Sequence, residues 1–386
     1  MQKPYINGIG QIKVAEHWDK SLREMAGEAA LLALQDADFP PVDGLFIGNM
    51  MSPTANRQSN LGPLLADWLD LNFTEAISVE SACASGSSAF RNAVLAIASG
   101  QITTALVVGV EKMTDSPSSE ITTSLASAAD ADLEVDMGVS FVALNALIMK
   151  RYMHEYGWNA SDFAIFSINA HNNATANPYA RFNKEITLQS FTTSPMVCDP
   201  INLLDASSIG DGAAAVVISS KPLEKSHSFV TVTGSASATD TISLQNRDVP
   251  TWLKAVELSA RRAYSQAGIS PAEIGVFEYH DAFSIMAALS LEACGFCDQG
   301  QAPKNANNGE IQIHGRIPVA TRGGLKARGH PVGATGLYQI VEVTQQLRGE
   351  CGTTQVENNT IGMAQNIGGS GSNVITHIIE RQPLNR

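Results

Sequence analysis

The segment Ile77-Ser78-Val79-Glu80-Ser81-Ala82-Cys83-Ala84-Ser85-Gly86 decides the fold of this chain. It begins with apolar and β-branched residues typical of a strand, and the Ala-, Ser-, Leu- and Val-rich segment 84–99 is typical of a helix. A cysteine at such a joint lies beside free N–H groups and the positive end of the helix dipole, which favour a thiolate. Cys83 is therefore a candidate nucleophile, and a buried structural cysteine is the alternative.

The elements around this segment alternate between strands and helices. Their order up to residue 110 is typical of a doubly wound parallel sheet with helices on both faces. A Ser-, Thr- and Asp-rich segment, 111–135, interrupts the order, and an inserted, largely helical region is predicted at 140–190 before a strand at 210–218. The predicted strands and helices of this first part are 5–14, 18–38, 44–48, 61–71, 77–80, 84–99 and 104–110.

The second part of the chain repeats this plan, which predicts a duplicated fold. Segment 368–376 has the layout of segment 210–219, a glycine turn before a β run, and segments 79–90 and 277–289 share a strand, a polar strand end and a helix. Strand ends of this kind open onto a common crevice, so Cys83 and His280 are predicted to face each other. The predicted elements here are strands 230–236 and 274–279 and helices 251–268, 282–294 and 333–347.

Composition excludes several classes of protein. A chain of 386 residues with 44% hydrophobic residues can bury a large core, and a net charge of −13 argues against nucleic acid or anionic membranes as main partners. Five scattered cysteines and a first segment without an apolar signal stretch indicate a reducing cytoplasm. No stretch reaches membrane-spanning length.

A glycine-rich loop at 329–336 carries His330 directly before a predicted helix. Its glycines allow a close approach to a substrate and Pro331 stiffens the turn, so His330 is a candidate base for Cys83. A hydrogen-bonded loop histidine is the alternative. The spacing fits no phosphate-binding loop.

His280 and Asp281 follow a predicted strand and open a helix. Asp281 is expected to cap that helix, whereas His280 has no capping task. The pair Cys294 and Cys297 has the spacing of a redox pair or half a zinc site, but it lacks a partner pair, and no metal site is predicted. The remaining histidines are expected to be surface or structural residues: His17, His154, His171, His227, His314 and His377.

Several of these motifs, in this order, resemble the thiolase superfamily: 81–86, 109–115, 280–283 and 329–336. Histidine at 280 in place of asparagine, and the segment 177–182, make the chain similar to sterol-carrier-protein-type and archaeal-type thiolases. The resemblance implies two similar βαβαβαββ halves with helices layered around two mixed sheets. The halves would be 1–221, including a loop domain at about 116–200, and 222–386.

One departure from this family matters: neither of the two thiols known in its members for the acid/base role is present. Many thiolases carry an acid/base cysteine in a C-terminal Cys-x-Gly, where this chain has Asn366-Ile367-Gly368, and the sterol-carrier type has a thiol at the position of Ala282. Asparagine exchanges no proton near neutral pH. His280 is then the best remaining candidate for proton transfer.

The resemblance implies a CoA-dependent C-acyltransferase, acetyl-CoA C-acetyltransferase above all, with no permanently bound cofactor. Cys83 would be acylated by an acyl-CoA while His330 takes its proton, and Claisen condensation, or thiolysis of a 3-ketoacyl-CoA in reverse, would follow. One oxyanion would be held by the N–H groups of Cys83 and Gly368, the other by His330 with His280 or a water. Phe283 is expected at the substrate, with Asn366 and Asp281 as polar support.

Coenzyme A is anionic, and Arg322, Lys326 and Arg328 beside the His330 loop are candidates to meet its phosphates, with ordinary surface charge as the alternative. The resemblance also implies a homodimer or homotetramer assembled through the sheet edges of the first half, and a possible small zinc-ribbon and OB-fold partner protein. Two rival functions stay open: acyl transfer to an acceptor other than acyl-CoA, and non-catalytic binding of acyl-CoA or lipid.

Overall fold

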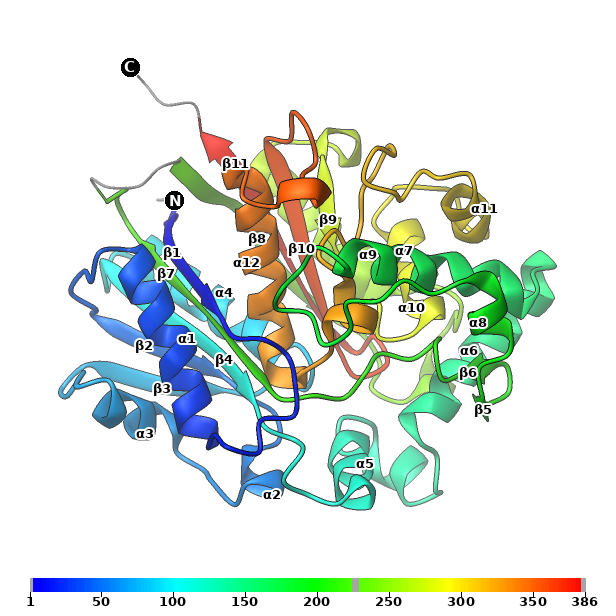
Figure 1. Cartoon of the computed structure of the whole chain (residues 1–386), viewed down its shortest axis with the longest axis horizontal. Coiled ribbons are helices and arrows are strands. Elements are labelled where there is room, and N and C mark those ends of the chain that lie inside the picture. The colour runs from blue at the N-terminus through cyan, green and yellow to red at the C-terminus, as the bar shows by residue number, and fades with distance from the viewer. Residues whose placement is uncertain (1–2, 224–228, 383–386) are drawn as a thin grey trace.

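The computed structural model describes residues 3–223 and 229–382 (Figure 1). Its strands are β1 (Tyr5–Gln11), β2 (Gly44–Gly48), β3 (Glu75–Val79), β4 (Thr104–Glu111), β5 (Met196–Cys198), β6 (Ile201–Asn202), β7 (Gly212–Ser219), β8 (Phe229–Thr239), β9 (Val276–Glu278), β10 (Ile361–Gly368) and β11 (Asn373–Gln382). Its α-helices are α1 (Leu22–Asp36), α2 (Ser52–Ala55), α3 (Leu61–Trp68), α4 (Ser85–Ala98), α5 (Ser118–Ala126), α6 (Phe141–Tyr156), α7 (Ala164–Ala174), α8 (Leu188–Thr192), α9 (Lys254–Ala267), α10 (Ser284–Ala293), α11 (Ala302–Asn307) and α12 (Thr335–Arg348).

Within the described residues, nine strands form one mixed sheet in the order β3-β2-β4-β7-β1-β8-β11-β10-β9. The duplicated α/β fold is thereby confirmed, and its two sheets are joined where Tyr5 and Ile6 of β1 pair with Thr231 and Val230 of β8. The wholly parallel order expected from the first elements is wrong. Strand β7 returns from the inserted region antiparallel to β4, and a short turn makes β10 and β11 an antiparallel hairpin.

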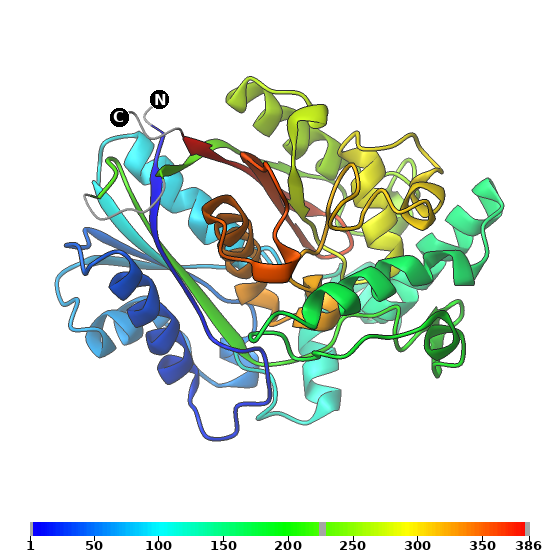
Figure 2. The ribbon, with the colours of Figure 1, turned by 45° about the horizontal axis from the view of Figure 1, so that its top comes forward.

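Helices α4 and α12 lie between the two parts of the sheet, and Figure 2 shows α12 in orange between the green and red strands. Side chains such as Phe90 of α4 and Leu337 of α12 form the inner core with strands of both halves. The helices begin close together, because a Cβ on Gly86 would lie 2.7 Å from the carbonyl oxygen of Gly333. Glycine at this contact therefore brings the two helix N-termini together.

Strand pairing shows how the halves correspond. In the second half β9 pairs in parallel with β10, as β2 pairs in parallel with β4 in the first half. A parallel bridge between Phe277 and Val319 lies at the other edge of β9, where β3 pairs with β2 in the first half. Segment 277–289 therefore corresponds to β2 and its following loop, and its match to segment 79–90 is wrong. The loop of His330, which precedes α12, takes the place of the Cys83 turn, which precedes α4.

The inserted region is largely helical, as expected, with α5 to α8 between β4 and β7. Among the residues described, we find no helix with the length and apolar character needed to cross a membrane. The boundary between halves at residue 221 follows β7 and stays a prediction.

Candidate active site

The Cys83 turn is held in a strained conformation between β3 and α4. Ala82 has a φ of +50°, a left-handed value that costs a non-glycine residue about 1 kcal/mol or more. The Ala82 N–H donates to Glu80 Oε1 at 2.5 Å, and the Ser81 N–H donates to Ser85 Oγ at 2.9 Å. These bonds fix the direction in which Cys83 leaves the backbone.

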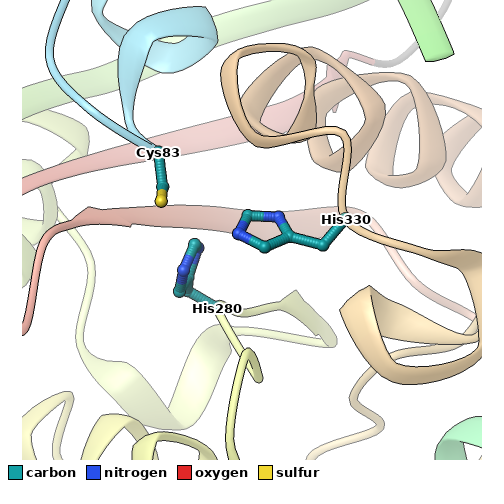
Figure 3. A group of neighbouring side chains, drawn as sticks. All are labelled: Cys83, His280 and His330. Atoms are coloured by element: carbon teal, nitrogen blue, oxygen red, sulfur yellow. The ribbon is translucent and has the colours of Figure 1, made fainter. Parts of the chain in front are cut away.

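The structure brings three of the predicted residues together (Figure 3). Cys83 Sγ and ring nitrogens of His280 and His330 all lie within 4.8 Å of one another. The two imidazole rings are 5.1 Å apart between centroids and nearly perpendicular, at 84°. The cysteine comes from the first half and both histidines from the second, so the cluster lies on the seam between the halves.

Hydrogen bonds define the tautomer of His330. Thr335 Oγ1 donates to the carbonyl oxygen of Pro331 at 3.1 Å, so its lone pairs face His330 Nδ1 at 2.7 Å. Nδ1 must then carry the proton of the neutral ring. The Nε2 lone pair of His330 is free to accept the proton of the Cys83 thiol.

His280 has the opposite tautomer. Asn366 Nδ2 can only donate, and it lies 3.0 Å from His280 Nδ1, which must therefore accept. The proton of the neutral His280 ring is consequently on Nε2. This arrangement makes His280 a hydrogen-bond donor toward the cavity.

Burial keeps the cluster uncharged. It raises the pKa of the Cys83 thiol to about 12, with Glu111 adding to the effect, and it lowers the pKa of His280 to about 3, helped by Arg328. The pKa of His330 also lies well below its ordinary value, because of burial first and then His280 and Arg328. Desolvation thus opposes the thiolate that we expected from the helix N-terminus.

The N–H group that reaches the cysteine sulfur, besides that of Cys83 itself, belongs to Gly369. Gly369 lines the cavity, whereas Gly368, which we expected in this role, ends β10 opposite Asn373. A Cβ on Gly368 would lie 2.5 Å from the carbonyl oxygen of Ser81. A substitution at Gly368 would thus push on the nucleophile turn whatever its effect on an oxyanion.

A cavity of about 270 Å³ opens beside the cluster. Phe283 lines it, as predicted, but Asp281 does not: it is buried, and its Oδ1 accepts the Leu325 N–H at 2.7 Å, so it does not cap α10. Most other lining residues are apolar: Met113, Leu125, Phe141, Val142, Val197, Leu203, Ile209, Met286 and Val332.

The cationic residues predicted to meet CoA phosphates are buried instead. Arg328 is fully buried and pairs with Glu342 at 2.9 Å, and Lys326 donates to the carbonyl oxygen of Asp205. Arg322 donates to Asn177 Oδ1 at 3.2 Å. The prediction of phosphate contacts is therefore wrong for all three, because their charged groups are buried and paired inside the fold.

Glu111 is a residue of the site that sequence reasoning missed. Its carboxylate is fully buried and accepts from Met50 N–H at 3.0 Å, Met51 N–H at 3.1 Å, Asn49 Nδ2 at 2.9 Å and Gly333 N–H at 2.9 Å. It thus ties the loop after β2 to the loop that carries His330. The available signal was a charged residue closing the continuous apolar run 104–110.

The remaining cysteines and histidines lie elsewhere. Cys294 is buried, and its thiol contacts Gln365 Oε1 at 3.4 Å. His154 and His314 are exposed and His17 is partly exposed, while His171 and His377 are buried, as expected for surface or structural residues. His227 lies outside the described residues.

The duplicated α/β fold, with a cysteine between two imidazoles at its seam, defines a class of enzymes that transfer acyl groups through sulfur. Profiles of the "Thiolase, N-terminal domain" and the "Thiolase C-terminal domain-like" family match residues 7–222 and 236–381. The chain belongs to the thiolase family. It is accordingly a CoA-dependent acyltransferase.

Individual proteins support this membership. The chain is 40% identical over 385 residues to an acetyl-CoA acetyltransferase of Methanothermobacter thermautotrophicus, covering 99% of this chain and 100% of that one. It is 30% identical to sterol carrier protein 2 of Bos taurus over 96% of this chain and 71% of that one. The solved structure of an Ltp2-ChsH2(DUF35) aldolase has the same fold, with a TM-score of 0.87, 24% identity and coverage of 100% and 99%.

The Glu111 network predicts that Glu111→Gln weakens both stability and the site. An amide has one acceptor oxygen, so two of the donors lose their acceptor, and we expect the free energy of unfolding to fall by about 2–4 kcal/mol. The His330 loop would also move relative to Cys83, which slows acylation by about tenfold or more. Urea unfolding and intact-mass analysis of acylation measure these effects.

The control is Glu120→Gln, a change at an exposed glutamate, which should alter neither quantity. A Glu111→Gln protein with the stability and acylation rate of the parent would show that this network does not hold the loop.

Proposed function

We propose that this chain forms acetoacetyl-CoA from two molecules of acetyl-CoA, and cleaves it in reverse, through an acyl group on Cys83. The observation that carries the proposal is the Cys83–His280–His330 cluster, whose sulfur lies beside a free Nε2 lone pair and a separate N–H donor. The acetyl preference follows the name of the Methanothermobacter relative.

In the first step, His330 Nε2 takes the thiol proton as Cys83 Sγ attacks the thioester carbon. We assign the oxyanion to the N–H groups of Cys83 and Gly369, because both are hydrogen-bonded to the sulfur. Gly368, which the sequence pointed to for this role, directly precedes Gly369. CoA then leaves as a thiol with the proton from His330. Acylation therefore returns His330 to its unprotonated form.

In the second step, the same His330 Nε2 removes the α-proton of the second acyl-CoA, because Asn366 cannot do so and His280 presents its N–H to the cavity. His280 Nε2–H donates to the enolate oxygen. The carbanion attacks the acyl carbon, the carbon–sulfur bond breaks, and Cys83 leaves as the thiol with the proton that His330 has taken. His280 is thus assigned an electrostatic role in place of the proton transfer we first expected.

Polar groups in the cavity are placed to bind the pantetheine amides of CoA. Asn145 Oδ1 and Ser208 Oγ are buried, have no partner among the described residues, and belong to cavity-lining residues. Unpaired buried acceptors and donors of this kind are costly unless a ligand pairs them. The CoA phosphates would lie outside this cavity, away from Arg322, Lys326 and Arg328.

The test is an assay with acetoacetyl-CoA and CoA, following the loss of enolate absorbance. Cys83→Ala should lower the rate by at least about 10⁴-fold, the scale seen when a nucleophile is removed. Cys198→Ser, a change at a partly exposed cysteine outside the cavity, is the control and should leave the rate unchanged.

The rival functions give different results in this assay. An acetyl group on Cys83 without formation of acetoacetyl-CoA would favour an acceptor other than acyl-CoA. No acyl adduct after exposure to acetyl-CoA would favour a binding protein.

The raised thiol pKa predicts the pH dependence of alkylation at Cys83. Because the pKa is about 12, the thiolate fraction should increase about tenfold per pH unit throughout pH 6 to 9. Peptide mass spectrometry after timed treatment with iodoacetamide gives the rate at Cys83 alone. A plateau beginning near pH 6 would instead indicate a preformed thiolate–imidazolium pair.

A homodimer through the edge of the sheet in the first half is also part of the proposal. β3 is an edge strand with exposed side chains, including Ile77 at 41% exposure, and Phe73 just before it is exposed. Exposed apolar edge strands pair readily with a second copy. Ile77→Lys should therefore convert a dimer to monomers in analytical ultracentrifugation, whereas Leu31→Lys on α1 should not.

A small partner protein stays a proposal as well. Its support is the name of the Ltp2-ChsH2(DUF35) aldolase structure, which describes a complex of a protein with this fold.

A further inference from the structure

The catalytic cluster has the composition of a metal site. A thiol and two imidazoles are preferred zinc ligands, and three protein ligands with an open fourth position are typical of accessible zinc sites. In residues 3–223 and 229–382, Cys83, His280 and His330 are the one group of three or more such side chains close enough to share an ion. We propose that these three residues bind one zinc ion, which competes with acyl-CoA for Cys83.

The geometry needs only a small adjustment to hold the ion. Ligand atoms of a tetrahedral zinc site lie about 3.5 Å apart, since the metal–ligand bonds are about 2.0–2.3 Å. The three donor atoms here lie within 4.8 Å of one another, so they must approach by about an ångström. The cavity of about 270 Å³ beside them leaves room for the fourth ligand, a water.

The surroundings of His330 already suit a ligand. Zinc-bound histidines usually donate their second N–H to an oxygen, which orients the ring and fixes the tautomer. His330 Nδ1–H donates to Thr335 Oγ1 at 2.7 Å, and its Nε2 is directed at the cluster. No proton has to move on this ring for zinc to bind.

The surroundings of His280 can be adapted by turning one amide. Asn366 Nδ2 now faces His280 Nδ1, and Asn366 Oδ1 is buried with no partner in the described part of the chain. Rotating the amide by half a turn would place Oδ1 against Nδ1, which then carries the proton and frees Nε2 for the metal. Asparagine can thus support both tautomers, one for the reaction and one for zinc.

Binding replaces one proton by the metal. The Cys83 thiol loses its proton to the solvent as the zinc–sulfur bond forms, and both imidazoles bind as neutral ligands. The occupied site then carries one positive charge. The nearby Glu111 carboxylate would attract this charge, and the Arg328 guanidinium would repel it. An acyl group on Cys83 removes the thiolate ligand, so acylation and zinc binding exclude each other.

Cobalt(II) is the probe, because a cobalt–thiolate bond gives a near-ultraviolet charge-transfer band that reports the sulfur ligand directly. Titration of the full chain should give this band with one ion per chain, and prior incubation with acetyl-CoA should prevent it. Zinc should displace the cobalt, and zinc added to the metal-free protein should release about one proton per site. Cys83→Ser should abolish the band.

The matched control is the double variant Cys294→Ser, Cys297→Ser, which removes the other cysteine pair with metal-like spacing and should retain the band. A band that survives Cys83→Ser, or disappears in the double variant, would overturn the proposal. So would absence of any thiolate band in the parent protein. Circular dichroism and thermal unfolding verify that each variant is folded.

Substitutions at Asn366 give a second test, because two of them should change the zinc affinity in opposite directions. Asn366→Asp offers an acceptor to His280 Nδ1–H in any orientation and should tighten zinc binding by about 10-fold or more, while Asn366→Ala should weaken it similarly. Both should slow the acyl transfer. Equal zinc affinities for the two variants would contradict the proposed role of the amide.

The cobalt and zinc titrations do not depend on the proposed reaction, whereas the competition with acetyl-CoA rests on the proposed acylation of Cys83. A protein that binds cobalt through Cys83 but makes no acetoacetyl-CoA would contradict the proposed function alone. A protein that turns over acetoacetyl-CoA without a cobalt–thiolate band would contradict the zinc site alone.

Discussion

One buried carboxylate fixes the distance between the two halves of the site. A charge inside the core is tolerated only when its hydrogen-bonding capacity is filled, and Glu111 obtains its partners from the loop after β2 and from Gly333. Movement of either loop would take hydrogen-bond donors away from the buried carboxylate. The buried pair Arg328–Glu342 holds the other side of the His330 loop in the same way. Two anchors of this kind explain how a glycine-rich loop keeps a catalytic ring in place.

The same burial sets how the site is activated. With the thiol pKa raised and both imidazole pKa values lowered, the free enzyme holds a neutral thiol between neutral rings. Forming a thiolate and an imidazolium in this cavity is costly in the absence of substrate. The cost falls when a thioester carbonyl accepts the electrons of the sulfur and N–H groups stabilise the resulting oxyanion. Proton transfer and attack are therefore coupled to substrate binding. The resting cysteine is correspondingly protected from adventitious oxidation.

Sequence reasoning identified the residues that are marked by their immediate neighbours in the sequence. Cys83, His280 and His330 stand at strand ends or in a glycine-rich loop. The prediction that Cys83 and His280 face each other is confirmed, although the match between segments 79–90 and 277–289 behind it is wrong. It failed where the informative contacts join segments that are far apart in the sequence. Strand β10 was missed because Gln365 and Asn366 are polar, and their partners Thr376 and His280 come from other segments. Arg322 and Lys326 looked like surface charges because their partners, Asn177 and the carbonyl oxygen of Asp205, are more than 100 residues away in the sequence.

The strand order also bears on the history of the chain. Asn49 follows β2 as His280 follows β9, and each is hydrogen-bonded to a side chain of the adjacent strand, Glu111 of β4 or Asn366 of β10. If both halves derive from one duplicated ancestor, the two copies of this contact now have different roles. In the first half it holds a loop in place, and in the second half it orients the reactive ring of His280. An ancestral pair of identical halves would have had two equivalent sites facing each other across the seam. Because the two halves now differ at this contact, the one sulfur of Cys83 lies beside two imidazoles.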